Sequence, residues 1–485
     1  MKRTVLSVAL SLLCVASFAC TNLIVGKKAS VDGSVICTYN CDGFGFASPL
    51  SYYPAGKHAP GEMVSLRGMG PGGEARLIPQ VEYTYGVAGL MNDHQVSIVE
   101  TTWDGREELV NREGWFDYFT LMAITLQRAA TAREAIAVID HLVQEYGYNS
   151  TGENLTICDK DEAWIMEIIG KGPGNKGAVW VAVKLPDDCV TAWANSSRIR
   201  KFPQAKKIDK KLGFYVAEDC MYSAECISFA KQKGYYSGPD ADFSWREAYG
   251  PLDFSAIRYC EARVWSFYRH HYDTAEMDKY LPYLYGDTSE YDALPLWIKP
   301  DTKLSVRDIM NDMRDWLPDV LGGVTYFNMD DASMVAYVPV YCGINRVPEP
   351  FRRENNSMQE FSFDSAFWMN NFVANMVYPR YSAMIGDLKE AQKELEDFYA
   401  EDQKEVEQRA ATMQAGDLVT YLTGKTESYT DMMMKRWEKL YKLLIVKYND
   451  QTIARGMGDQ PKYSPVFIDA VKAQTGNRYV KPDHN

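Results

Sequence analysis

The first third of the chain alternates short apolar runs with polar turns, a pattern typical of β-strands. Residues 21–26 form one such run, the Asp-Gly pair at positions 32 and 33 is a strong hairpin signal, and residues 35–39 form the returning run. We therefore expect a hairpin here. The same arrangement recurs around the polar Asn92-Asp93 pair, in the runs 85–90 and 96–101.

Four further strand-like segments follow in the middle of the chain. They are rich in aromatic and β-branched residues, and their connections are short and rich in Asp, Gly and Pro. Because such connections suit neighbouring antiparallel strands, the four segments predict an antiparallel meander. The segments are residues 154–158, 163–169, 178–185 and 189–194.

Helical periodicity separates the two groups of strands. Residues 119–130 predict one helix and residues 131–146 a clearer one. Thr131 and Glu134 have the spacing of a capping box, and Gly147 follows the last apolar position. Strands, then helices, then strands again indicate an α+β fold, in which antiparallel sheet packs against helices.

The last part of the chain predicts mainly helices. We expect a helix over residues 305–316, a strand over 334–341, and helical structure from residue 365 onward with a break at Pro379. Charged positions between the apolar ones indicate a solvated helix face. The apolar positions expected on the opposite face are Leu388, Ala391, Leu395 and Phe398.

The first nineteen residues have the features of a secretory leader. A basic start is followed by an apolar run, and Ser17 and Ala19 place small residues at the −3 and −1 positions of a cleavage site. Cleavage after Ala19 would make Cys20 the first residue of the mature chain, so we expect an exported protein, periplasmic or extracellular. A lipoprotein signal usually has Leu three positions before its cysteine, and this chain has Ser17 there.

A cysteine at a free amino terminus combines two halves of a nucleophilic catalyst. Its thiol can attack a carbonyl group, and its α-amino group can accept the thiol proton. That amine titrates near neutrality, with an ordinary pKa of about 7.7–8.0. The alternatives are a cysteine that lies near the cleavage site by chance and one that carries a lipid.

Composition narrows the function classes. Hydrophobic residues make up 46% of the 485 positions, enough for a substantial core, and no apolar run outside the leader approaches the roughly 18 residues that span a bilayer. The net charge of −13 argues against nucleic-acid binding, which needs clustered Lys and Arg.

Cysteine and histidine usage limits the remaining chemistry. Besides Cys14 in the leader and Cys20, eight cysteines remain, an even number that permits disulfides in an exported protein, while buried free thiols are the alternative. The six histidines form no HExxH motif, and no paired CxxC motifs occur. We therefore expect neither a metal nor another cofactor.

Several sequence blocks carry a resemblance to a known family. The opening block reads CTNLIVGKKASVDGS from Cys20 to Ser34, and further blocks follow in order as far as about residue 350. These blocks resemble the N-terminal-cysteine dipeptidases of the Ntn-hydrolase superfamily, which are related to penicillin V acylases and bile salt hydrolases. The later blocks are GENLTI at 152, DEAWIMEI at 161, PDD at 186, ANS at 194, ARVW at 262 and YVPVY at 337.

The resemblance implies a fold and an activity. The fold would be a four-layer αββα sandwich of two antiparallel sheets with added C-terminal helices. Residues 20–350 would form the catalytic domain and residues 351–485 a mostly helical extension packed on it. The activity would be hydrolysis of the peptide bond of dipeptides through an acyl-enzyme on Cys20, so the partner would be a small peptide substrate; a homo-oligomer stays open.

The resemblance also assigns roles to individual residues. Asn195 matches the asparagine that stabilises the oxyanion, a role that needs preorganised donors, and Thr102 falls where relatives place a second donor. Asp42 stands where the family has an acid that orients the α-amine. Arg263 matches a family arginine that holds this acid or binds a substrate carboxylate, with Arg258 as its substitute. A turn asparagine, a strand threonine, a loop aspartate and surface arginines are the structural alternatives.

One position departs from the family pattern. Relatives usually carry Arg three residues before the acid, and this chain has Tyr39, with Cys41 next to Asp42. A tyrosine supplies no fixed positive charge, so the family's usual charge network and substrate preference are not carried over to this chain, and Tyr39 is a candidate substrate-binding residue. Two rival functions stay open. One is an N-acyl amide hydrolase of the penicillin V acylase or bile salt hydrolase type, with an acyl pocket from the aromatic-rich residues 200–300, and the other is a lectin-like binding protein without activity.

Overall fold

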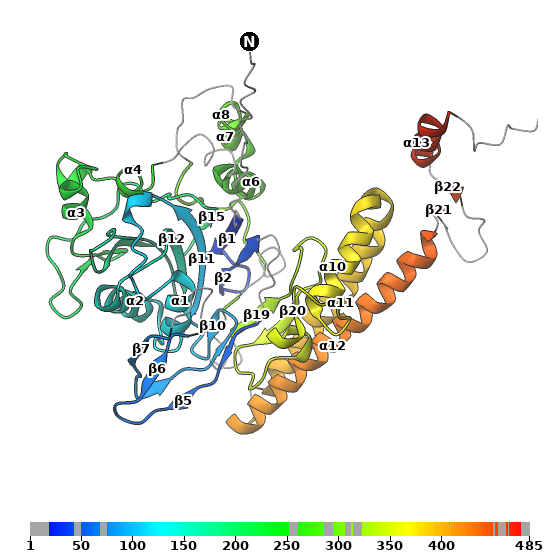
Figure 1. Cartoon of the computed structure of the whole chain (residues 1–485), viewed down its shortest axis with the longest axis horizontal. Coiled ribbons are helices and arrows are strands. Elements are labelled where there is room, and N and C mark those ends of the chain that lie inside the picture. The colour runs from blue at the N-terminus through cyan, green and yellow to red at the C-terminus, as the bar shows by residue number, and fades with distance from the viewer. Residues whose placement is uncertain are drawn as a thin grey trace, which may run out of the picture. The chain divides into compact units, whose positions relative to one another are not determined.

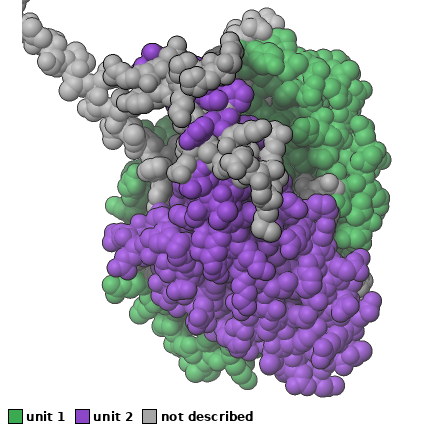
Figure 2. All heavy atoms as spheres, turned by 90° about the vertical axis from the view of Figure 1, so that its right-hand side faces the viewer, with its two compact units in different colours: residues 1–46, 56–85, 94–314 green, residues 47–55, 86–93, 315–485 purple. Residues whose placement is uncertain are grey.

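The computed structural model describes most of the chain (Figure 1). Its described residues divide into two compact units, coloured green and purple in Figure 2. Unit 1 takes residues from 1–46, 56–85 and 94–314, and unit 2 takes residues from 47–55, 86–93 and 315–485. The boundary at residue 350 therefore stays a prediction. The described residues are 19–42, 50–67, 75–251, 260–285, 294–305, 312–313, 323–410, 412–449, 452–453, 462–463 and 465–476.

One antiparallel sheet of unit 1 begins with the predicted hairpin. Strand β1 (Ala19–Val25) pairs with β2 (Val35–Cys37), as the Asp-Gly turn indicated. The amino end of β1 also pairs with the short β3 (Asn40–Asp42), which sets Cys20 directly opposite Cys41. Beyond β2 lies β18 (Asp312–Met313), so the helix predicted over 305–316 is wrong at these two residues, which form a strand. Residues 306–311 and 314–316 lie outside the described residues.

The second sheet of unit 1 contains three of the four predicted meander strands. In the order of the sheet, β11 (Ser97–Asp104), β12 (Gly152–Cys158), β13 (Ala163–Gly170) and β14 (Ala178–Lys184) are antiparallel neighbours. The sheet continues with β17 (Cys220–Tyr222) and β16 (Tyr215–Val216).

The fourth predicted strand corrects the meander. Strand β15 (Val190–Trp193) leaves the second sheet and pairs with β1, with Val190 opposite Val25. The connection before β15 explains this, because its backbone binds the end of β1: Gly26 donates to the Cys189 carbonyl at 2.9 Å and Lys28 donates to the Asp187 carbonyl at 2.8 Å. Apolar periodicity marks a strand but does not choose its partner.

Helices cover both sheets of unit 1, as Figure 1 shows. Helix α1 (Tyr118–Leu126) packs on β11, and α2 (Ala132–Tyr146) packs on β12 to β14. The predicted cap is confirmed, since the Thr131 hydroxyl accepts from the Glu134 amide and Gly147 ends α2 at φ +84°. Helix α6 (Ala262–His271) packs on β15.

The two sheets of unit 1 also contact each other. Strand β1 lies against β11 and β2 against β12, and the Cys37 and Ser97 side chains meet at 3.6 Å. This contact brings the start of β1 close to the end of β11. The remaining elements of unit 1 are β5 (Gly56–Lys57), β6 (Met63–Ser65), β7 (Leu77–Pro79), β8 (Tyr83–Thr84), α3 (Cys226–Gln232), α4 (Trp245–Tyr249), α7 (Thr274–Asp278) and α8 (Leu281–Tyr285).

Unit 2 contains short strands and the long predicted helices. Strand β9 (Val87–Ala88) pairs with β10 (Met91–Asn92), with a turn at residues 89 and 90 between them. Asn92 therefore lies in a strand, and the predicted turn begins one residue later, at residues 93 and 94. The predicted strand over 334–341 narrows to β20 (Val338–Tyr341). Its other elements are β4 (Tyr52–Tyr53), β19 (Gly323–Phe327), α10 (Ala366–Val377), α11 (Tyr381–Ala410), α12 (Ala415–Lys447), β21 (Thr452–Ile453), β22 (Lys462–Tyr463) and α13 (Pro465–Thr475).

The long helices confirm the predicted helical tail, with one correction. The helix break at Pro379 is confirmed by a 3-10 turn between α10 and α11. Leu388 and Leu395 are buried, but Phe398 is 43% exposed and Tyr399 takes its place in the core. The helical geometry explains the difference. Tyr399 follows Leu395 by about one helical turn and so lies on the same buried face, whereas Phe398 lies at the edge of that face.

The α+β class is confirmed by these mixed helices and antiparallel sheets. Among the helices that the structure describes, none combines the length and apolar character needed to cross a bilayer. The nine cysteines from Cys20 to Cys342 are free thiols, and all but Cys41 are buried. The sequence left disulfides and buried thiols as alternatives, and the structure has buried thiols.

Candidate active site

Cys20 lies near the amino end of β1, where β1, β3 and β15 meet. Its side chain is buried, at 1% exposure. The Cys20 backbone nitrogen donates to the Asn195 side-chain oxygen at 2.8 Å. The predicted nucleophile and the predicted oxyanion residue, 175 positions apart in the sequence, are therefore in direct contact.

Asn195 follows β15 in the left-handed backbone region, at φ +57°. Asparagine tolerates this conformation better than most residues, so the turn alternative describes its backbone correctly. Its side chain has a role beyond the turn, because the side-chain nitrogen donates a hydrogen bond to the Thr102 carbonyl at 2.7 Å. An amide nitrogen carries two hydrogens, so a second donor remains for a developing oxyanion.

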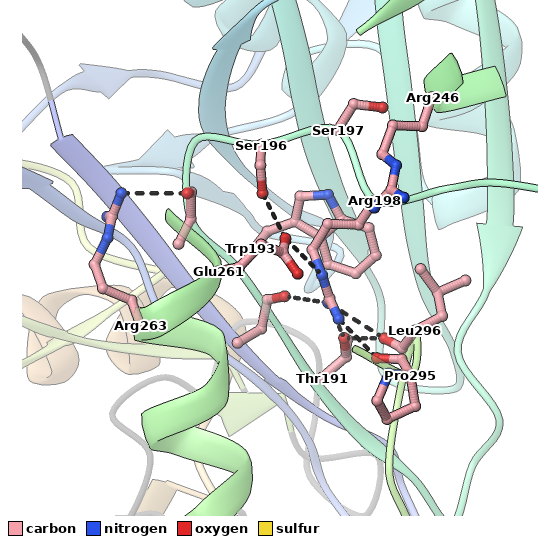
Figure 3. Close-up of polar contacts among 12 residues, drawn as sticks. Thr191, Trp193, Ser196, Ser197, Arg198, Arg246, Glu261, Arg263, Pro295 and Leu296 are labelled. Atoms are coloured by element: carbon pink, nitrogen blue, oxygen red, sulfur yellow. Dashed lines mark hydrogen bonds and ion pairs between the residues drawn. The ribbon is translucent and has the colours of Figure 1, made fainter. Parts of the chain in front are cut away.

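Arg263 projects from α6 (Figure 3) and hydrogen-bonds Asn195 and the first residues of β1. Its guanidinium donates to the Cys20 carbonyl at 2.6 Å, the Thr21 hydroxyl at 2.7 Å and the Asn195 side-chain oxygen at 2.8 Å. These contacts fix the first residues of β1 against Asn195. They are neither of the two roles predicted for this arginine, binding of Asp42 or of a substrate carboxylate, which both stay predictions.

Two other predicted residues fall partly outside the described part of the chain. The Asp42 backbone pairs with Ala19 in β3, but its side chain lies outside the described residues. Arg258 and the leader up to residue 18 lie outside them entirely. The roles given to these residues remain predictions.

A buried network that the sequence analysis missed holds the Asn195 turn (Figure 3). Glu261, two residues before Arg263, accepts from the Ser196 hydroxyl at 2.8 Å and pairs with Arg198 at 3.4 Å. The Arg198 guanidinium also donates to the Pro295 carbonyl at 2.7 Å. Because both ions are nearly inaccessible, loss of one partner would leave a buried charge uncompensated.

A second buried carboxylate supports the same turn. Glu167 accepts from the Arg198 and Ile199 backbone amides, at 2.7 and 3.1 Å, and from the Ser197 hydroxyl. Burial raises the pKa of Glu167, and these donors oppose the rise. A glutamate inside an otherwise apolar strand, as in DEAWIMEI, is the sequence signal that could have identified it.

Tyr39 points to a carboxylate beside the nucleophile. Its hydroxyl donates to Glu100 Oε1 at 2.6 Å, and the Cys20 sulfur lies 3.7 Å from the same oxygen. Burial and the charge of Glu100 raise the pKa of Tyr39, so it acts here as a neutral donor. Sequence analysis missed Glu100, a charged residue in the apolar run before Thr102.

A second glutamate lies beside Glu100. Thr102, opposite Glu153 in the ladder of β11 and β12, donates from its hydroxyl to Glu153 Oε1 at 2.8 Å. Burial raises the pKa of Glu153 well above its usual value, and the charge of Glu100 adds to this. Thr102 therefore contacts Asn195 with its carbonyl and Glu153 with its hydroxyl.

The surroundings of Cys20 keep its thiol protonated in this structure. A hydrogen bond with Cys41, burial and the charge of Glu100 all raise the pKa of Cys20, in that order of size. Among the described residues, no cluster of three or more His, Cys, Asp or Glu has an arrangement that could hold a metal ion.

Comparison with known proteins gives one family and consistent relatives. The profile of peptidase family C69 matches residues 19–53, 72–316 and 310–394. A probable dipeptidase of Salmonella dublin is 25% identical over 383 residues, covering 67% of this chain and 81% of its own. A probable dipeptidase of Latilactobacillus sakei is 22% identical, covering 88% and 97%, and dipeptidase A of Lactobacillus helveticus is 23% identical, covering 77% and 84%.

The matched residues include every side chain placed around Cys20 above, from Tyr39 in the first segment to Arg263 in the second. The resemblance of the opening block is thereby confirmed over most of the chain. The chain belongs to peptidase family C69, the family of cysteine dipeptidases, and is a hydrolase of peptide bonds.

Proposed function

We propose that this protein is an exported dipeptidase whose nucleophile is the thiol of Cys20 and whose general base is the α-amino group of the same residue. The observation that carries the proposal is that two side chains, Asn195 and Arg263, hydrogen-bond the backbone of Cys20. Asn195 accepts from its nitrogen at 2.8 Å, and Arg263 donates to its carbonyl at 2.6 Å. The residue that would begin the mature chain is thus held at both ends of its backbone.

The chemistry requires that the chain be cut before Cys20. In the uncut chain the Cys20 nitrogen is an amide, which is not a base, and the thiol is held protonated by its surroundings. Cleavage after Ala19 would convert that amide to an amine while Asn195 keeps its hydrogen bond. Export and activation would then be one event, with the mature protein in the periplasm or outside the cell.

Each step of the proposed hydrolysis can be assigned to a group near Cys20. The α-amine takes the thiol proton, and the thiolate attacks the peptide carbonyl carbon. The second Nδ2 hydrogen of Asn195 donates to the oxyanion, with the backbone near Thr102 as the other donor. The leaving amine takes the proton back from the α-ammonium, which leaves a thioester on Cys20. Water, deprotonated by the same amine, then releases the acid and restores the thiol.

The fold supports the proposal through its layers in unit 1. Helices α1 and α2 pack on the β11–β14 sheet, that sheet contacts the sheet of β1 and β2, and α6 packs on β15. We propose that this order is the αββα sandwich of the Ntn hydrolases.

The test is a comparison of mature wild-type protein with Cys20→Ala and Cys20→Ser variants. Mass spectrometry should show a mature chain that starts at Cys20, and the wild type should release amino acids from dipeptides. Cys20→Ala should lose all turnover with an unchanged circular dichroism spectrum. Full activity of Cys20→Ala, or a mature chain with another first residue, would overturn the mechanism. Preference for N-acyl amides over dipeptides would instead establish the acylase alternative.

A further inference from the structure

We propose that Glu100 is the anchor for the α-ammonium group of the substrate, so that the site takes peptides with a free amino terminus. This inference rests on the proposed function and adds the residue that selects the free amino terminus of the peptide.

Among the described residues, the Glu100 carboxylate accepts hydrogen bonds from neutral groups, the Tyr39 hydroxyl at 2.6 Å and the Cys20 thiol at 3.7 Å. The neighbouring Glu153 carboxyl is a further donor when it is protonated. In the parts of the chain that the structure describes, no lysine, arginine or histidine pairs with Glu100 or Glu153. Glu100 and Glu153 are both 99% buried. In each of them the Oε2 oxygen accepts no hydrogen bond from a hydroxyl, thiol or amide group of the described residues.

Burial raises the pKa of both carboxyl groups, well above its usual value for Glu153, while hydrogen bonds from Tyr39, Glu153 and Cys20 oppose the rise at Glu100. Of the two groups, Glu100 therefore ionises more readily. A buried carboxylate without a cation is costly, because neutral donors recover only part of its lost hydration. The site is therefore complementary to a cation, and a peptide with a free amino terminus carries one.

The position of Glu100 matches the geometry of attack. In any peptide the amino nitrogen and the carbonyl carbon of the first residue are two bonds apart, about 2.5 Å. The attacked carbon must come within roughly 3–3.5 Å of the sulfur. With Glu100 Oε1 at 3.7 Å from the Cys20 sulfur, an ammonium bound to the carboxylate puts the first carbonyl carbon within reach of that sulfur.

Binding of the ammonium would also favour thiolate formation. The charge of Glu100 is one of the causes that raise the pKa of Cys20, and a bound cation cancels that charge. Among the described residues, the ionisable groups that interact with Glu100 are acids, and the mature chain would add the α-amine of Cys20. They are Cys20 on β1, Tyr39 before β3, Tyr118 on α1, Tyr148 before β12, and Glu153 on β12.

The test compares two substrates that differ only in the ammonium group: L-alanyl-L-alanine and propionyl-L-alanine. We expect the wild type to favour alanyl-alanine by about a hundredfold or more in kcat/KM, since a site built around a polar group rejects an analogue that lacks it. Glu100→Gln should lower kcat/KM for alanyl-alanine by about tenfold or more, and should leave propionyl-alanine unchanged or faster, because the lost charge no longer opposes thiolate formation. Asp104→Asn, at the exposed end of the same strand, is the matched control and should keep the full preference.

A binding measurement separates this inference from the proposed function. We expect the Cys20→Ser background to keep the fold and to slow or stop turnover. In this background L-alaninamide should bind by calorimetry, and Glu100→Gln should weaken that binding by about tenfold. An equal loss of kcat/KM on both substrates, or unchanged alaninamide binding, would overturn the role of Glu100. If Glu100→Gln does not fold, Tyr39→Phe keeps the carboxylate and should keep the preference; loss of the preference there would also overturn it. Absence of dipeptide hydrolysis with normal alaninamide binding would instead reject the proposed function.

Discussion

At the scale of single residues, the site depends on buried groups that carry charge or accept several hydrogen bonds. Asn195 joins the backbone nitrogen of Cys20, the Thr102 carbonyl and the Arg263 guanidinium through one amide group. Glu100 and Glu153 place two buried carboxyl groups with raised pKa values next to the nucleophile. A buried titratable group with a shifted pKa makes the free energy of unfolding depend on pH. Replacing it with a group that does not titrate should therefore change stability by an amount that depends on pH.

Glu153→Gln gives the clearest case at this scale. The folded-state pKa of Glu153 lies above its unfolded value, so the fold is favoured while this group is protonated and loses stability as pH rises from the unfolded pKa toward the folded one. Glutamine keeps the shape and a donor without titrating. We expect Glu153→Gln to gain about 1–3 kcal/mol over wild type at pH 8 and much less at pH 4.5. Urea unfolding at both pH values measures this, with Glu113→Gln at an exposed position as the control.

A gain of the same size at both pH values would contradict this account, because it would mean that packing or hydrogen bonding, and not titration, separates the two proteins.

At the scale of elements, the decisive event is that β15 pairs with β1. This pairing carries Asn195 to Cys20, and the turn before β15 is bound to the residues that follow β1. Gly26 permits that approach, since a Cβ there would lie 2.5 Å from the Asp187 carbonyl oxygen. The pattern of apolar residues predicted most strands and helices of this chain, but it gave the same periodicity for β14 and β15, which lie in different sheets.

Gly26→Ala tests this close approach. Because the neighbouring atoms belong to backbone, they cannot move aside as a flexible side chain would, and we expect a loss of about 2–3 kcal/mol in the free energy of unfolding together with lower activity. Gly424→Ala in α12 is the matched control, since no heavy atom lies within 4 Å of a Cβ there. It should be neutral or stabilise by up to about 1 kcal/mol. A neutral Gly26→Ala would show that the turn does not constrain β15.

At the scale of the whole molecule, the cysteines are distributed through the core without crosslinks. Cys37 and Cys158 lie in different sheets of unit 1, Cys342 lies in unit 2, and all three are buried thiols. Stability therefore depends on apolar packing, to which a cluster of buried apolar side chains in unit 1 and another in unit 2 contribute. Burial raises the pKa of Cys220 and Cys226, which makes both thiols slow to react.

Thiol titration of the mature protein tests the absence of crosslinks. Unfolded in guanidinium without reductant, the mature chain should react with nine equivalents of Ellman's reagent, one for each described cysteine. The native protein should react with far fewer at early times, since Cys41 alone is partly exposed. A count lower by two or more in the unfolded protein would show disulfides formed during export.

The sequence by itself determined the local structure and the identity of the chemistry. Caps, turns and apolar spacing act over a few residues, so they specify α2, the β1–β2 hairpin and the long C-terminal helices without reference to the rest of the chain. The motif at Cys20 likewise indicated the family, because it is contiguous. Tertiary structure alone decided which residues surround that cysteine. The partner of β15, the placement of Glu100 and Glu153 beside the sulfur, and the support of Asn195 by Glu167 and Glu261 all join segments far apart in sequence, and no local pattern carries the distance between them.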